Sequence, residues 1–299
     1  MTELFSDLII WYLFLGGLGG GAYLVAWTLS LLAACKGGPW ALLHARVRMP
    51  LLLVALGSLV AGALCLFKDL AREEQALLLF SKPTLTPISV GTFTLSALIA
   101  CAAVLVVLSI RNPIGSESSA QRLVAAVGAA AALVVVAYTG VLLAGMPSVP
   151  LWASPALPAL FAFSALSCGI AAALAAAAFA EPDLERLRPA LSKLMRADTV
   201  LIALEILAAA FLGLHAEGSP AAAASLATLA FGPLAAQFWI GFVLCGLAIP
   251  AIMESVPARS ASAHRGWCIV ASCSVLAGGF FLRFCTVAAG THLSLFMFA

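Results

Sequence analysis

Charged side chains are concentrated in one short segment of a chain that otherwise contains few of them. Only 9% of the 299 residues are Asp, Glu, Lys or Arg. Six of them lie between two apolar stretches: Lys68, Asp69, Arg72, Glu73, Glu74 and Lys82. Charged groups at the edge of an apolar segment can pass protons to water or form a docking surface. A solvated loop is the alternative interpretation.

Tyrosines at the ends of apolar segments are a second candidate for chemistry. Tyr138 lies in VVVAYTGVLLAGMP, and Trp11 and Tyr12 lie near the start of the chain. A phenol can hydrogen-bond a carbonyl while its ring packs against an apolar ligand. Alternatively, these aromatic residues are anchors at a membrane surface, where Tyr and Trp are common.

Within the apolar segments, two glycines and two isolated charged residues are further candidates for a functional role. Gly16 and Gly20 are four residues apart, a spacing that admits a neighbouring backbone or a flat ligand. Glu205 and Arg283 each stand within an apolar stretch, where charge is expensive and marks a pathway or a pair. From the helical rise, they lie roughly 12 Å and roughly 25 Å above the same membrane surface, so we expect no direct ion pair. For Arg283 we expect loop carboxylates such as Glu217, backbone carbonyls or a partner protein.

The cysteines and histidines are not spaced as the ligands of a metal site usually are. The eight cysteines contain no C-x-x-C pair, and we interpret them as small buried hydrophobic residues. His44 and His264 fall in predicted loops, and only His215 with His292 could form a bis-histidine haem site. Solvated or capping histidines explain all four, so we expect no metal, haem or iron–sulfur cluster in this chain.

Helices that cross a membrane must position these residues. The chain is 64% hydrophobic, with a mean hydropathy of +1.12, whereas a soluble protein has about 25% charged residues. A spanning helix needs about 20 apolar residues. We predict an all-α integral membrane protein with eight transmembrane helices, at residues 8–35, 49–67, 90–110, 121–146, 156–180, 197–216, 234–253 and 266–290.

The distribution of basic residues predicts the orientation. With alternating loops, 11 Lys and Arg residues fall on one side and 3 on the other. The positive-inside rule then places both termini and the 68–89 loop outside. We expect one domain, residues 1–299, made of two four-helix bundles that comprise residues 1–150 and 151–299.

The outer part of the first bundle has the features that a quinone requires. Lys68, Asp69 and Arg72 are expected at the outer end of the second helix, and Ser89 at the entry to the third. A quinone needs apolar walls, hydrogen-bond partners for two oxygens and a route for protons to water. The local chemistry permits such a site.

Six stretches match the landmarks of a known family in order. They are WYLFLGGLGGGAYLVA, CLFKDLAREEQALLLFSKPTLTPISVGTF, YTGVLLAGMPSVPLW, LPALFAFSALSCG, FWIGFVLCGLAIPAIME and GGFFLRFCTVAAG. Over nearly its whole length the sequence resembles the polysulfide reductase membrane-subunit family, also called NrfD-like. The resemblance implies a haem-free anchor in the bacterial cytoplasmic membrane that exchanges electrons with menaquinone or ubiquinone. The implied partners are a four-cluster ferredoxin-like iron–sulfur subunit and a molybdopterin catalytic subunit or multihaem cytochrome, with no nucleic acid.

The resemblance also assigns residues. Tyr138 is similar to the family's helix-four tyrosine, and Asp69 to its helix-two acidic or histidine position, so both are candidate catalytic residues. The candidate quinone-binding residues are Tyr12, Gly16, Gly20, Lys68, Arg72, Ser89 and Tyr138. Ala71 and Glu73 depart from the family's usual Gly and Pro, and Tyr12 lies near the place where some members have a histidine.

Two other functions compete with this one. A secondary transporter would use Glu205 and Arg283 as coupling residues, although the sequence shows no convincing internal repeat. A haem b anchor would need the histidine pair named above.

Overall fold

The described part of the protein is helical. A computed structural model describes residues 7–69, 87–111, 118–146, 148–180, 184–255 and 261–290. Within these ranges the elements are α1 (Asp7–Lys36), α2 (Pro39–Asp69), α4 (Pro87–Arg111), α5 (Ser119–Ala144), α6 (Ala156–Ala180), η1 (Leu184–Arg186), α7 (Arg188–Ala216), α8 (Pro220–Ala230), η2 (Gln237–Ala248), α9 (Ile249–Ser255) and α10 (Ala261–Ala288).

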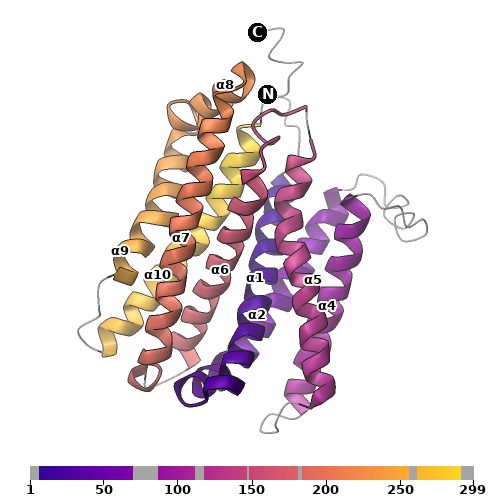
Figure 1. Ribbon diagram of the computed structural model, residues 1–299, viewed down its shortest axis with the longest axis vertical. Coiled ribbons are helices and arrows are strands. Elements are labelled where there is room, and N and C mark those ends of the chain that lie inside the picture. Colours follow the sequence, from indigo (N-terminus) through magenta and orange to yellow (C-terminus); the bar gives the residue numbers. More distant parts are fainter. Residues whose placement is uncertain are drawn as a thin grey trace.

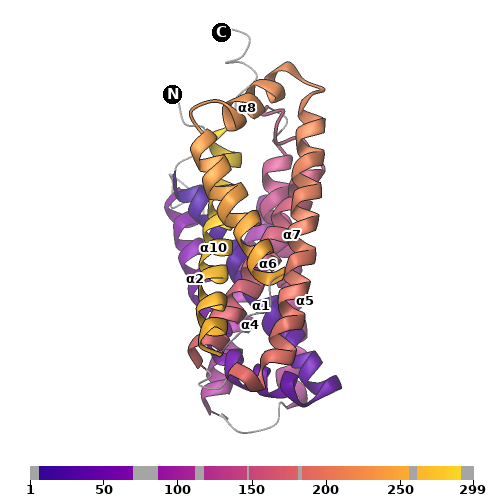
Figure 2. The same ribbon diagram turned by 90° about the vertical axis from the view of Figure 1, so that its left-hand side faces the viewer.

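Eight helical segments are long and apolar enough to cross a membrane, which confirms the predicted number. They run alternately in opposite directions along the long axis of the molecule (Figure 1). The first residue of α1 and the last of α10 therefore lie at the same end, together with the end of α2 and the start of α4 (Figure 1). The short helix α8 lies at this end too, as Figure 2 shows.

The helix α2 begins ten residues before the predicted span. Gly37 and Gly38 have φ angles of 59° and 53°, which glycine adopts without strain, and they turn the backbone from α1 into α2. The first turns of α2 are held by the burial of Trp40 and Leu43. As a result His44 lies in a helix. His264 also lies in a helix, α10 (Ala261–Ala288), so the prediction that these two histidines lie in loops was wrong.

Basic side chains gather at the end of the molecule that contains the α1–α2 turn. We call this the basic end. Its described basic residues are Lys36, Arg46, Arg48, Arg111, Arg122, Arg186, Arg188, Lys193, Arg196 and Arg265. At the opposite end the described residues include Lys68.

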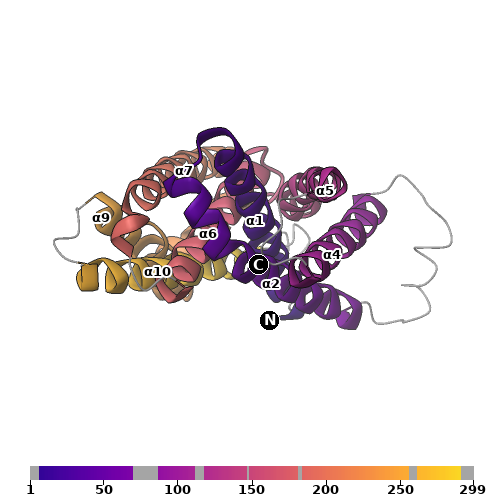
Figure 3. The ribbon, with the colours of Figure 1, turned by 90° about the horizontal axis from the view of Figure 1, so that it is seen from below.

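The helix α1 is the central element. It packs along α2, α5, α6 and α10, and Figure 3 shows it with α6 on one side and α5 on the other. Of an apolar 18-residue stretch of α1, 78% is buried inside the protein, a larger share than in the other seven spanning helices. A helix surrounded in this way needs small residues on several faces.

Glycines supply these faces. A Cβ on Gly21 would overlap the carbonyl oxygen of Ala165, and one on Gly169 would overlap the backbone of Gly21. The backbones of α1 and α6 are therefore in direct contact. A Cβ on Gly20 would lie 2.8 Å from Val136 of α5, and one on Gly19 would lie 2.7 Å from the Ser58 hydroxyl of α2. Helix packing thus accounts for most of the glycine-rich stretch.

Gly21→Ala should separate α1 from α6. Because the clash is with backbone atoms, no rotamer change relieves it, and we expect the unfolding free energy to fall by about 1–3 kcal/mol or more. Thermal unfolding of the purified protein in detergent measures the effect. Gly57→Ala is the matched control, since no atom lies within 4 Å of its Cβ position. Equal stability of the two variants would contradict the direct contact.

Candidate functional site

Two buried tyrosines, Tyr12 of α1 and Tyr138 of α5, lie towards the end opposite the basic end, and we call them the tyrosine pair. Their exposed fractions are 2% and 8%, and the two phenols are close enough to interact electrostatically. The ring of Tyr138 covers Gly91 of α4, where any Cβ would overlap the ring. Residues far apart in sequence on α4 and α5 are therefore in contact here, and Tyr12 of α1 lies within electrostatic range of them.

Gly16 leaves space beside this tyrosine pair. A Cβ there would meet the Thr139 methyl group at 3.8 Å and the Tyr12 ring at 4.0 Å, which are ordinary contacts. Gly20, one turn further along α1, is packed against α5. Contact of Gly16 or Gly20 with a ligand stays a prediction.

Polar candidates lie at the neighbouring ends of α2 and α4. Lys68 is exposed in the last turn of α2, whose final residue is Asp69. Ser89 lies in the first turn of α4 and is 2% exposed, two residues before the Gly91 that Tyr138 covers. Arg72 lies outside the described residues. The described candidates therefore gather at one end of α1, α2, α4 and α5.

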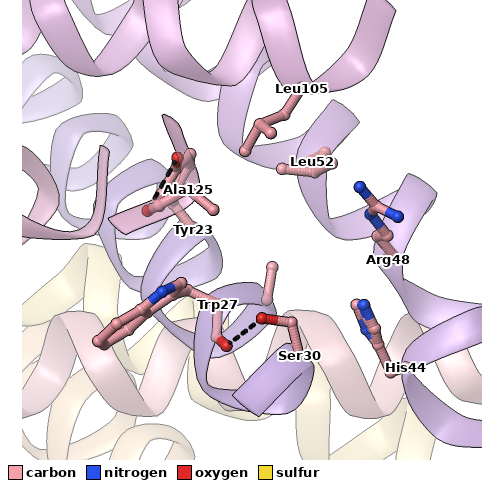
Figure 4. Close-up of a pocket in the computed structure, with 9 residues that line it drawn as sticks. Tyr23, Trp27, Ser30, His44, Arg48, Leu52, Leu105 and Ala125 are labelled. Atoms are coloured by element: carbon pink, nitrogen blue, oxygen red, sulfur yellow. Dashed lines mark hydrogen bonds between the residues drawn. The ribbon is translucent and has the colours of Figure 1, made fainter. Parts of the chain in front are cut away.

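Three cavities between described residues lie elsewhere. One is at the basic end between α1, α2, α4 and α5, and Figure 4 shows Tyr23, His44 and Arg48 around it. The Tyr23 hydroxyl donates to the carbonyl oxygens of Val124 and Ala125, both at 3.4 Å. The second is an apolar cavity of about 60 Å³ among α6, α7, α8, η2 and α10, and the third is a groove between α1 and α7.

Arg283 of α10 is fully buried and binds backbone atoms of three helices. Its Nε donates to the Leu13 carbonyl oxygen at 3.2 Å, and its Nη1 donates to the Gly279 carbonyl at 2.7 Å and the Ser164 hydroxyl at 3.1 Å. Nη2 donates to the Phe161 carbonyl at 3.4 Å. Of the three predicted kinds of partner, backbone carbonyls are confirmed, and Arg283 joins α1, α6 and α10.

Glycines make room for this guanidinium. A Cβ on Gly17 would lie 2.7 Å from its Nη2, and one on Gly279 would lie 3.6 Å from its Nη1. Glu205 is buried on α7, and no ion pair joins it to Arg283, although the structure describes both residues.

A pair of carboxyl groups, one buried and one half-buried, lies between α7 and α9. Asp198 is fully buried, and its carboxyl lies beside that of Glu254 and the Ser167 hydroxyl. The Thr199 hydroxyl donates to Oε2 of Glu254 at 3.1 Å. Among the described residues, no donor makes a well-formed hydrogen bond to either oxygen of Asp198. Two facing carboxyl groups of this kind can share a proton between their oxygens.

The sequence did not reveal this pair, because both residues stand at the edges of apolar stretches, where carboxylates are common. One signal was available. Asp198 and Glu205 are seven residues apart, a spacing that places both on one face of α7, and both are buried. Glu254 reaches this face because the π-helix η2 leads directly into α9, which packs against α7.

Comparisons with known proteins agree with one another. The family model described as "Polysulphide reductase, NrfD" matches residues 2–293. The sequence is 29% identical to the C subunit of polysulfide reductase from Wolinella succinogenes, over 93% of this protein and 92% of the relative. It is 33% identical to protein NrfD of Escherichia coli, over 52% of this protein and 48% of the relative.

A double-mutant cycle can test the hydrogen bonds that hold Arg283 in place. Arg283 is held by four hydrogen bonds, so we expect Gly17→Ala to lower the unfolding free energy by about 1–3 kcal/mol. In an Arg283→Ala background the added methyl group meets no guanidinium, and most of this cost should disappear. Thermal unfolding of the wild type, both single variants and the double variant gives the coupling energy. Additive effects would show that the side chain moves aside freely.

Proposed function

The chain belongs to the NrfD family of polysulphide reductase proteins, and from this membership we propose that it is the quinone-interacting anchor of a respiratory complex. Eight apolar helices and the family make it a multi-pass integral membrane protein. The anchor exchanges electrons between a membrane quinol and an iron–sulfur partner subunit. The tyrosine pair of α1 and α5 is the single observation that carries the proposal.

The arrangement of basic residues supports an orientation. Ten described Lys and Arg residues lie at the basic end, against Lys68 at the other, which fits a basic end in the cytoplasm. The tyrosine pair and the end of α2 then lie towards the outer surface. Both termini are outside in this orientation.

The tyrosine pair offers the chemistry for binding the quinone head group. A phenol can donate a hydrogen bond to one quinone oxygen, and the apolar helix walls accommodate the ring and tail. Gly62 of α2 lies beside Gly16 and the Tyr12 backbone. Asp69 is seven residues further along α2, roughly 10 Å towards the outer end. A proton therefore has a short path from the head group to water.

The reaction follows from this placement. Oxidation of a quinol to a quinone releases two protons and two electrons. Asp69 accepts the two protons one after the other and releases each at the outer surface, while Tyr138 holds the quinone oxygen that faces it. The electrons pass to the iron–sulfur partner docked on the same face, and then to a molybdopterin subunit or a multihaem cytochrome. The reverse direction uses the same groups.

The rival functions receive less support from the described residues. A transporter needs a coupling residue that can change partners, whereas Arg283 is committed to three carbonyl oxygens and Ser164. A haem b anchor needs two facing histidines. Among the candidates, His215 is exposed at the end of α7, and His292 lies outside the described residues.

Tyr138→Phe should slow quinol oxidation by the assembled complex. A hydrogen bond that strengthens as the quinol loses its proton contributes to the rate, and we expect its loss to cost at least about tenfold. The readout is reduction of the partner's redox centres by a short-chain quinol, with dithionite reduction as the check on assembly. Tyr23→Phe is the matched control, because Tyr23 is a buried tyrosine of α1 at the basic end. A wild-type rate in Tyr138→Phe would refute its assignment.

Asp69→Asn tests the proton route. The amide cannot accept the proton, so quinol-dependent turnover should be suppressed while dye-driven activity of the catalytic subunit stays intact. Loss of both activities together would indicate misassembly, and unchanged quinol turnover would remove Asp69 from the mechanism.

An absorption spectrum separates the quinone anchor from a haem b anchor. We expect the purified protein to show no Soret band before or after reduction with dithionite. A Soret band that shifts on reduction would favour the haem-containing alternative.

A further inference from the structure

A groove of about 260 Å³ lies between α1 and α7, with α6 as its floor. Its walls are apolar and include Leu29 of α1, Leu166 and Ile170 of α6, and Leu201 of α7. Thr28 also lines it, but its hydroxyl already donates to the Leu24 carbonyl oxygen of its own helix at 2.8 Å. The walls therefore offer a place for hydrocarbon.

One ammonium group stands where the groove meets the basic end, and a second lies near the same indole ring. Lys193 of α7 lines the groove together with Trp40 of α2. The Nζ atoms of Lys36 and Lys193 each lie 6.0 Å from the centre of the Trp40 ring, so they are at most twice that distance apart. Figure 3 shows how the turn between α1 and α2 brings these three elements together.

These two lysines have no anion among the described residues. Both are exposed, and neither forms an ion pair with a described carboxylate. An anion that approaches this indole is attracted by both ammonium groups. The chemistry of the mouth is therefore that of an anion site, joined directly to an apolar groove.

The dimensions match one leaflet of a membrane. Lys193 and Leu201 are eight residues apart, so the groove runs roughly 12 Å along α7. Half the hydrocarbon thickness of a bilayer is about 15 Å. A tryptophan at the charged end suits the head-group level. A packing helix, about 10 Å wide, would not fit this volume.

We propose that this groove binds an anionic phospholipid of the inner leaflet. The phosphate lies between Lys36 and Lys193, and one acyl tail lies in the groove against α6. Basic pockets between transmembrane helices at the cytoplasmic side recognise anionic head groups in this way.

The lipid site is separate from the proposed quinone site. The groove residue of α1 that lies nearest to Tyr12 is Val25, 13 residues further along the helix, so the groove begins roughly 20 Å from Tyr12. The inference requires only that the protein spans a membrane with its basic end at an anionic surface. A failure of the quinone proposal would leave it unchanged.

Native mass spectrometry of the purified protein, titrated with phosphatidylglycerol or phosphatidylcholine, tests this proposal. We expect tighter binding of phosphatidylglycerol, weakened about fivefold by Lys36→Ala and about fivefold by Lys193→Ala. This factor corresponds to about 1 kcal/mol for each basic residue at an anionic surface. Arg111→Ala is the matched control, because it removes an exposed charge at the basic end of α4, away from the groove.

A second pair of variants tests the groove itself. Ala197 is exposed and lines the groove, so Ala197→Trp should block the acyl tail and reduce phosphatidylglycerol binding with both lysines intact. Val200→Trp on the same helix is the control, since it is exposed and outside the lining. Equal binding of both lipids, insensitivity to the lysine variants, or displacement of the lipid by a short-chain quinone would each overturn the proposal.

Discussion

The close approach of α1 to its neighbours is the constraint on which the other features of this protein depend. In a membrane, lipid is as apolar as the helices, so packing and hydrogen bonds must hold the helices together. Direct backbone contact at Gly21 and Gly169 sets the distance between α1 and α6. Arg283 then fixes the same helices through the Leu13 and Phe161 carbonyls. Tyr12 depends on this arrangement, because a displaced α1 would carry it away from Tyr138.

The helices could be predicted from the sequence because its composition allows few alternatives. In lipid, a long apolar stretch satisfies its backbone hydrogen bonds by forming a helix. The sequence has eight such stretches, and the described structure contains eight helices long enough to span a membrane. The first and last residues of the helices follow less directly from the sequence. The start of α2 was missed because Arg46 and Arg48 interrupt the apolar stretch, although burial of Trp40 and Leu43 extends the helix. The pairing of Tyr12 with Tyr138 follows from tertiary packing, which spacing within single helices does not encode.

Polar groups divide this molecule into regions with different chemistry. The tyrosine pair lies towards one end, beside the end of α2. Lysines and a tryptophan surround an apolar groove at the other end. Between α6, α7 and α9, towards the basic end, the carboxyl groups of Asp198 and Glu254 face each other. Each region uses helices that α1 or α6 holds in place, so a change in the packing of α1 and α6 should affect more than one of them.

The central claim is that a quinone binds beside the tyrosine pair. Photolabelling of the membrane-embedded protein with a photoreactive short-chain quinone, followed by mapping of the labelled peptides by mass spectrometry, tests it most directly. We expect labels on α1 around Tyr12 and on α5 around Tyr138, and excess unlabelled quinone should reduce them. Labels confined to the groove at Lys193, or displaceable labels on neither α1 nor α5, would contradict it.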